Sequence, residues 1–101
     1  MQISIILTNL KGNTKILLDD EKKSCTVNGE EKNVNVDKVA SRLLRIVSSW
    51  EDSYINPLII DGLTYEVKII KDGKTYTYYG SNDFPKNFHQ FTALINEVMN
   101  D

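Results

Sequence analysis

The stretch that decides the fold is residues 61–80, which read DGLTYEVKIIKDGKTYTYYG. Two runs of alternating polar and apolar residues flank the dipeptide Asp72-Gly73, and this dipeptide favours a two-residue type I′ hairpin turn. A loop of this length fixes the strand pairing, because a slip by one residue would turn the apolar set to solvent. The stretch therefore predicts a β-hairpin with a defined register.

The predicted register gives the hairpin two different faces. One face is apolar and aromatic beyond a lysine pair at the tip, and the other pairs a lysine with a threonine and a glutamate with a tyrosine. The pairs on the first face are Lys71 with Lys74, Ile69 with Tyr76, Val67 with Tyr78 and Tyr65 with Gly80; those on the second are Lys68 with Thr77 and Glu66 with Tyr79. Gly80 has no side chain and so leaves room for the Tyr65 ring to lie across the partner backbone.

A helix is predicted after the hairpin, starting at Pro85, since proline costs nothing at the first helical position. Asn82 and Asp83 precede it and are residue types that satisfy the free N–H groups of a helix start. The helix has one apolar stripe, formed by Phe88, Phe91, Leu94, Ile95, Val98 and Met99. His89 falls on the opposite side and is predicted to be solvated.

The first half of the chain predicts three strands and a helix. Residues 3–7, 14–19 and 24–28 have strand patterns separated by polar turns, although Ile6 interrupts the polar face of the first strand. Residues 30–35 read as a loop, to which Val34 and Val36 could add a short strand. Asp37 is predicted to cap a helix whose apolar stripe ends at Trp50.

These elements predict one α+β domain over residues 1–101. An N-terminal antiparallel meander and the C-terminal hairpin would form one sheet, with the two helices packed on one of its faces. The segment from Tyr54 to Ile60 fits neither element, because Asn56-Pro57 breaks regular structure while its neighbours are apolar. It either packs over the core of its own domain or forms an exposed contact patch.

Composition narrows the classes of function. The chain has 101 residues, 26% of them charged, and a net charge of −2, so it lacks the basic excess of nucleic-acid binders. Its single cysteine, Cys25, rules out an internal disulfide and suits the reducing cytoplasm. No signal peptide is recognised, and no apolar run reaches the roughly 18 residues of a membrane helix. We therefore expect a soluble cytoplasmic protein that binds neither nucleic acid nor membrane.

The second half of the chain resembles a family of small uncharacterised bacterial proteins. The resemblance covers residues 50–98 and rests on Trp50-Glu51-Asp52, on Asp61-Gly62 before an alternating strand, and on the run from Gly80 to Phe88 with Phe91 three residues later. Members of that family have a similar Gly-Ser/Asn, Tyr/Phe-Pro and Asn-Phe/Tyr ending before a final helix. The family has no established activity, so the resemblance implies a fold and no mechanism.

No catalytic site can be assembled from these residues. One histidine and one cysteine are too few for a common zinc site. Cys25 alternates with Val27 in a strand and reads as a buried, inert thiol. The sequence therefore predicts no catalytic residue, no metal ligand and no cofactor.

A weaker indication comes from acidic residues at loop ends. Glu51, Asp52, Asp61 and Asp83 could converge and bind calcium or serve as an acid/base pair, but the spacing of a calcium loop is absent. Asn82, after Gly80-Ser81, could help to hold an anion at the helix start. These residues support the alternative function, a small-molecule or metal-binding protein or an enzyme that uses Asp52, Asp61 and Asp83. Their simpler interpretation is as turn-formers.

The best functional indication is Tyr79, which projects beside Glu66 and Lys68. An exposed tyrosine is typical of interfaces, and the other interpretation is packing along the Lys68 stem. Together with Tyr54 and its apolar loop, these residues predict a non-catalytic protein-binding module. Small size and acidity also suit a protein that neutralises a partner, as toxin-immunity proteins do. Pairing of an edge strand between two copies would give a homodimer instead.

Overall fold

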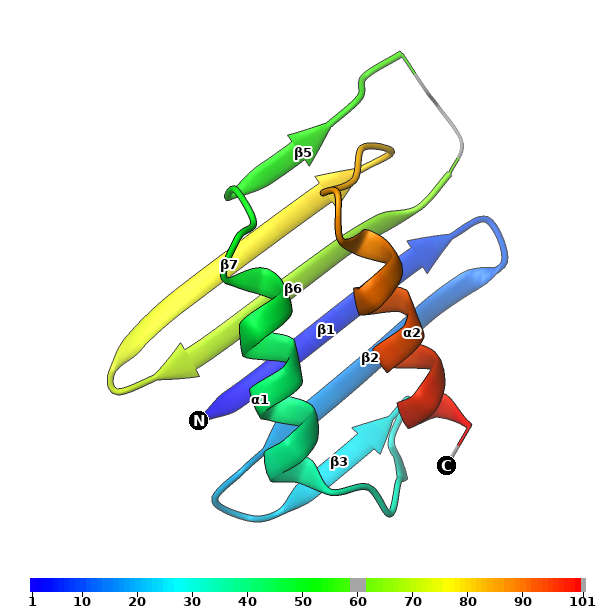
Figure 1. The fold of residues 1–101 in the computed structure, drawn as a ribbon. Coiled ribbons are helices and arrows are strands. Elements are labelled where there is room, and N and C mark those ends of the chain that lie inside the picture. Colours follow the sequence, from blue (N-terminus) through cyan, green and yellow to red (C-terminus); the bar gives the residue numbers. More distant parts are fainter. Residues whose placement is uncertain (59–61, 101) are drawn as a thin grey trace.

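The structure is a computed structural model that describes residues 1–58 and 62–100. Its strands form one sheet in the order β4-β3-β2-β1-β6-β7-β5. Both helices lie on the same face of this sheet, which confirms the predicted α+β architecture (Figure 1). The strands are β1 (Gln2–Asn9), β2 (Gly12–Asp19), β3 (Ser24–Val27), β4 (Glu30–Glu31), β5 (Ser53–Ile55), β6 (Thr64–Lys71) and β7 (Lys74–Ser81). The helices are α1 (Val36–Val47) and α2 (Phe88–Met99).

The β6–β7 hairpin has the predicted register throughout. Lys71 opposes Lys74, Tyr65 opposes Gly80 and Glu66 opposes Tyr79. A side chain added at Gly80 would collide with the Tyr65 ring, which confirms that the glycine makes room for it. Strand β6 also pairs with β1, so the hairpin joins the N-terminal meander into one sheet.

Strand β5 corrects the expectation of a purely antiparallel sheet. Ser53–Ile55 runs parallel to β7 and pairs with Tyr79–Ser81. This pairing was not predicted, because it depends on where the chain lies after the end of α1 and not on a local sequence pattern. Of the two alternatives for the apolar residues of the Tyr54–Ile60 segment, packing over the core does not hold for Ile55 and Leu58, which are exposed, Leu58 by 90%. The rest of that segment, residues 59–60, lies outside the described residues.

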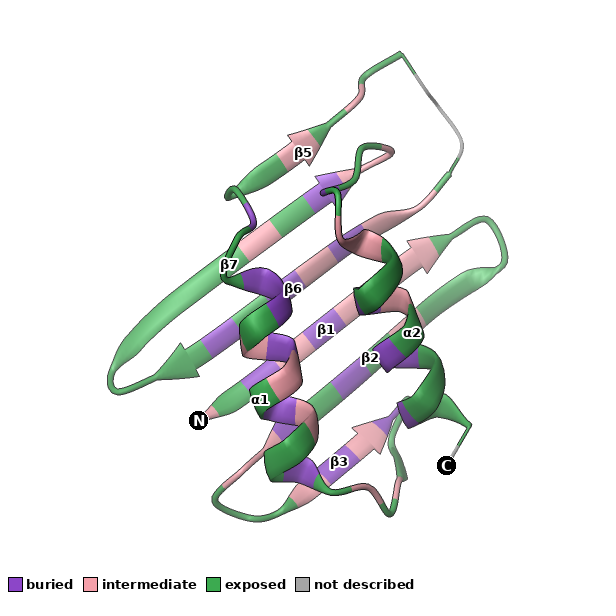
Figure 2. Cartoon of the chain, viewed as in Figure 1, coloured by how far each residue is buried: buried purple, intermediate pink, exposed green. Residues whose placement is uncertain are grey.

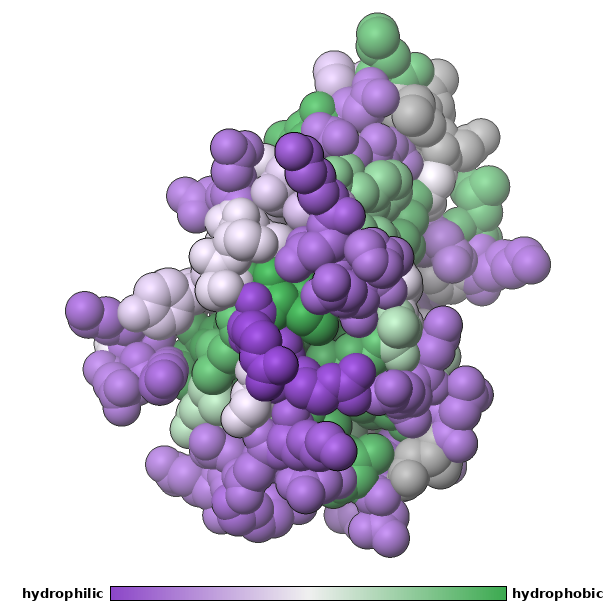
Figure 3. All heavy atoms as spheres, viewed as in Figure 1, coloured by the Kyte–Doolittle hydropathy of each residue, from purple (hydrophilic) through white to green (hydrophobic). Residues whose placement is uncertain are grey.

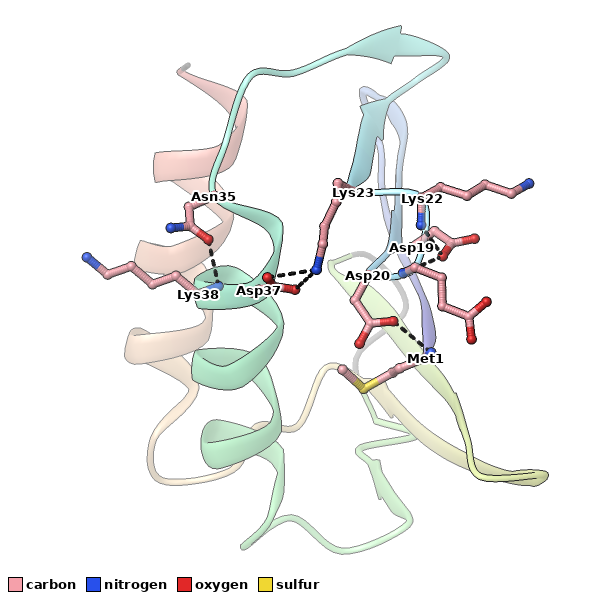
Figure 4. A network of polar contacts seen from close by, with 9 residues as sticks. Met1, Asp19, Asp20, Lys22, Lys23, Asn35, Asp37 and Lys38 are labelled. Carbon is pink, nitrogen blue, oxygen red and sulfur yellow. Dashed lines mark hydrogen bonds and ion pairs between the residues drawn. The ribbon is translucent and has the colours of Figure 1, made fainter.

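Helix α1 begins earlier than predicted, and Val36 belongs to it rather than to a strand. Its N-cap is Asn35, whose side chain accepts a hydrogen bond from the Lys38 N–H. Asp37, the predicted cap, lies in the first turn, where the positive end of the helix dipole also stabilises a carboxylate. Its carboxylate pairs with the Lys23 ammonium group at 2.7 Å and links α1 to the turn between β2 and β3 (Figure 4).

Helix α2 begins later than predicted, at Phe88 and not at Pro85. Its N-cap, Asn87, does not bond to the helix through its side chain. The side chain instead accepts from the Trp50 indole N–H at 2.7 Å and donates to the Ile46 carbonyl at 2.9 Å. The start of α2 is therefore held to the end of α1.

The core lies between the sheet and the two helices, where the buried side chains of the central strands meet those of α1 and α2. Figure 2 shows buried residues on these strands and on both helices. Trp50 packs here within about 6 Å of several aromatic rings, with Phe91 at a centroid distance of 5.2 Å. Tyr76 was predicted to belong to this core, but it is 44% exposed because the hairpin tip extends beyond both helices (Figure 1). Neither described helix is long and apolar enough to span a bilayer.

Candidate binding surface

The open sheet face is the side of the sheet that carries no helix. Strand alternation places on it every second residue of the central strands, and the pairing arranges these in cross-strand rows. One row contains Lys15, Ile6, Glu66, Tyr79 and Ser53, and the next contains Thr26, Leu17, Ser4, Lys68 and Thr77. The structure thus brings together three of the predicted binding residues, Tyr79, Glu66 and Lys68.

Apolar side chains interrupt this face in three adjacent strands. Leu17 is 44% exposed, Ile70 is 40% exposed and Ile6 is half-buried. Each follows or precedes a core residue directly in sequence, as in Ile16-Leu17-Leu18 and Ile69-Ile70. A strand with water on one side alternates, whereas consecutive apolar residues are typical of strands covered on both sides. Leu17 and Ile70 were not predicted as site residues, although these doublets were the signal for them.

A shallow hollow of about 380 Å³ lies on the open sheet face. Leu17 and Ile70 give it apolar walls, and Lys68 and Lys22 add positive charge. Asp19 lies at the same place, and its carboxylate accepts hydrogen bonds from the backbone N–H groups of Lys22 and Glu21 (Figure 4). These bonds, the one from Lys22 above all, hold the pKa of Asp19 below its ordinary value. The hollow therefore combines apolar contact area with fixed charges of both signs.

Tyr79 adds an exposed ring on β7, which two strands separate from Leu17 on β2. It is 39% exposed, so its ring is not covered by packing along a lysine stem alone. Its backbone N–H donates to the Asp52 carbonyl of the segment leading into β5, at 3.0 Å. Because this strand pairing holds the backbone on both sides, the ring is displayed from a fixed position.

The structure does not bring Tyr54 to this face. Tyr54 opposes Gly80 and so points to the helix side, opposite to Tyr79. Its hydroxyl accepts a hydrogen bond from the Glu51 N–H at 2.9 Å. It lines a separate hollow of about 400 Å³ with Phe84 and Lys86.

Asn82 lies apart from any helix start. It follows β7, has a left-handed backbone with φ of 58°, and donates its N–H to the Leu63 carbonyl at 3.0 Å. Because α2 begins only at Phe88, the helix dipole that was expected to favour an anion beside Asn82 is not at this position. The prediction that Asn82 and Asp83 satisfy the helix N-terminus is therefore wrong.

The predicted acidic end is described only in part, because Asp61 lies outside the described residues. Asp52 contributes a backbone carbonyl to Tyr79, and the Asp83 carboxylate accepts from the Phe84 N–H at 3.0 Å. Within residues 1–58 and 62–100, no three His, Cys, Asp or Glu side chains are arranged to hold a metal ion. The carboxylate site at Asp52, Asp61 and Asp83 stays a prediction.

The helix side of the molecule is mainly hydrophilic at its outer surface, with apolar side chains visible between the helices (Figure 3). His89 is exposed, as predicted, and lines a hollow of about 320 Å³ with Arg42 and Arg45. Arg42 forms an ion pair with Glu97, so α1 and α2 are also joined at their solvent side. Cys25 is buried, as predicted.

Comparisons with known proteins identify no relative of this chain. A scan of family models, a search of curated proteins and a search of solved structures each return no match for this chain. The resemblance of residues 50–98 to small bacterial proteins therefore stays a prediction. The proposed function therefore rests on the geometry of the open sheet face.

Proposed function

We propose that this chain is a small, non-catalytic protein-binding module whose open sheet face docks on a partner protein. The observation that carries the proposal is the presence on that face of exposed apolar residues, in strands that already bury their other side. Covering Leu17, Ile70 and Tyr79 would remove apolar surface from water, at roughly 25 cal/mol per Å².

The charges on the same face would give the contact its orientation. Glu66 lies opposite Tyr79, and Lys68 lies at the hollow beside Ile70. Charges at the rim of an interface mainly set specificity and association rate, whereas buried aromatic residues contribute most of the affinity. Tyr79 would therefore be the affinity determinant, with Glu66 and Lys68 selecting the partner.

A pull-down from host lysate tests the proposal, with the captured proteins identified by mass spectrometry. Tyr79→Ala is compared with Tyr76→Ala, which removes a similarly exposed tyrosine from the same strand but from the opposite face. Circular dichroism checks that both variants are folded.

The expected result is a stoichiometric partner that binds the wild type and Tyr76→Ala, and binds Tyr79→Ala at least about tenfold more weakly. Retention of the partner by folded Tyr79→Ala at wild-type affinity would contradict the proposal. Equal loss in both variants, or no stoichiometric partner, would also count against the open sheet face.

A further inference from the structure

Half of strand β7 has an outer edge that no other described strand covers. Strand β5 covers only Tyr79–Ser81, and β7 from Lys74 to Thr77 lies at the border of the sheet (Figure 1). The exposed edge of a strand is a template for pairing with another chain. Such edges are usually short, strongly charged or covered, and here the only charge on the free part is Lys74.

The direction of the free backbone groups follows from the hydrogen bonds to β5. The Tyr79 N–H donates to Asp52, and the Ser81 carbonyl accepts from Asn56, so odd-numbered residues of β7 point away from β6. Backbone groups alternate in direction along a strand. Thr75 and Thr77 therefore direct their N–H and C=O groups outward, and among the described residues no strand pairs with them.

The charges at the two ends of this edge are of opposite sign. Lys71 and Lys74 lie directly opposite each other at the hairpin tip, where the repulsion between their like charges is destabilising. Asp72 lies between them in the turn. At the other end of the free edge, Glu51 and Asp52 are exposed beside the start of β5.

We propose that two copies of this chain pair through β7, antiparallel and centred on Thr75. An antiparallel twofold pairing brings the hairpin tip of each copy, where two lysines outweigh Asp72, to the Glu51–Asp52 end of the other, so a net positive tip meets acidic residues twice. It also pairs the outward N–H and C=O groups of Thr75 with those of Thr75 in the other copy. Lys74 then lies opposite the exposed Tyr76 ring of the other copy, where a cation–π contact is favourable. Centring on Thr75 keeps the partner strand clear of β5.

Self-association through so short an edge is weak. A contact of about five residues per strand buries less than the ~1,000 Å² that a stable interface usually exceeds. Sedimentation equilibrium from about 10 μM to 1 mM therefore covers the range in which the mass should rise from one chain to two.

Charge reversal gives the sharper test. Lys74→Glu and Asp52→Lys should each weaken the dimer about tenfold or more, because each substitution acts twice across the twofold axis. The double variant should recover most of the wild-type association. Lys11→Glu, at an exposed lysine of the β1–β2 turn, is the matched control and should leave association unchanged.

A backbone test is independent of charge. Thr75→Pro removes an outward N–H and keeps the β6–β7 pairing, because proline is tolerated at an edge position whose N–H faces solvent. It should abolish the dimer, whereas Thr75→Val should retain it. Amide exchange of Thr75 and Thr77 should slow as the protein concentration rises.

Three results would overturn the proposal. The first is a monomer at every concentration. The second is a dimer whose double charge variant is no stronger than the single variants. The third is a dimer in which the Thr75 and Thr77 amides exchange as fast as in the monomer, which would place the contact on another surface.

Discussion

Asn87 connects three parts of the molecule through one side-chain amide. It satisfies the Trp50 indole N–H and the Ile46 carbonyl while its own residue caps α2. Trp50 is buried, so its N–H has little access to water when this partner is removed. An unsatisfied buried donor costs more than the net value of the hydrogen bond itself.

Asn87→Ala should therefore lower the free energy of unfolding by about 1–3 kcal/mol, measured by urea denaturation. Trp50 fluorescence reports the same transition, since it is the only tryptophan. Asn96→Ala, an exposed asparagine within α2, is the matched control and should be neutral or slightly stabilising. Equal stability of Asn87→Ala and wild type would contradict the role of this amide.

Packing, and not the backbone angles, requires a glycine at position 80. A Cβ at this position would meet the ring of Tyr65, which is fully buried and donates its hydroxyl to the Asp83 carbonyl at 2.7 Å. Burial also raises the pKa of the Tyr65 phenol above its ordinary value, so its hydroxyl stays a hydrogen-bond donor well into the alkaline range.

Gly80→Ala should destabilise the fold by about 1–3 kcal/mol through overpacking. The effect should be smaller when Tyr65→Leu is already present, because the ring that collides is gone. Thermal unfolding of both single variants and the double variant measures this coupling. Strict additivity of the two substitutions would show that the ring does not enforce the glycine.

At the scale of elements, the two helices are joined at their solvent side by Arg42 and Glu97. The hydrogen bond donated by Arg42 lowers the pKa of the Glu97 carboxyl in the folded state, with attraction to Arg42 and Lys38 adding to it. A carboxyl whose folded pKa is depressed contributes stability above its unfolded pKa and loses it as pH falls through the folded pKa.

Glu97→Gln should consequently be less stable than wild type at neutral pH, and the difference should shrink as pH falls from about 5 toward 3. Because both side chains are partly exposed, added salt should also reduce the difference. Urea unfolding across this pH range measures it. A difference that is independent of pH would exclude the carboxylate as its source.

Elements with local signals were predictable from sequence, and those that depend on distant contacts were not. The Asp72-Gly73 turn fixed the β6–β7 register from adjacent residues. Both helix starts were misplaced, because Asn35 and Asp37 are equally good capping types and because Trp50 recruits the Asn87 side chain. The parallel pairing of β5 depends on α1 and has no local pattern.

The candidate site follows the same division. Strand alternation placed Tyr79, Glu66 and Lys68 on one face, as the structure has them. Their grouping with Leu17 could not be predicted, because strand order was not readable from the sequence and β1 separates β2 from β6. Tyr54 was misgrouped, since its face is set by the parallel pairing of β5.

At the scale of the whole molecule, one sheet separates two different surfaces. Its helix side contains the core and a charged outer surface, whereas its open side combines apolar residues with charges of both signs. The free edge of β7 lies at the border of these surfaces, so a β7–β7 dimer would leave the open sheet face accessible. Partner binding and self-association can therefore be tested separately.

Site-specific photo-crosslinking in host cells tests the central claim most directly. A photoreactive phenylalanine replaces Leu17 or Tyr79 on the open sheet face, and in the control it replaces the exposed Ala93 on α2. We predict that both open-face positions crosslink to the same protein and that Ala93 does not. Crosslinks from Ala93 alone, or none from Leu17 and Tyr79 in the folded protein, would contradict a partner-binding sheet face.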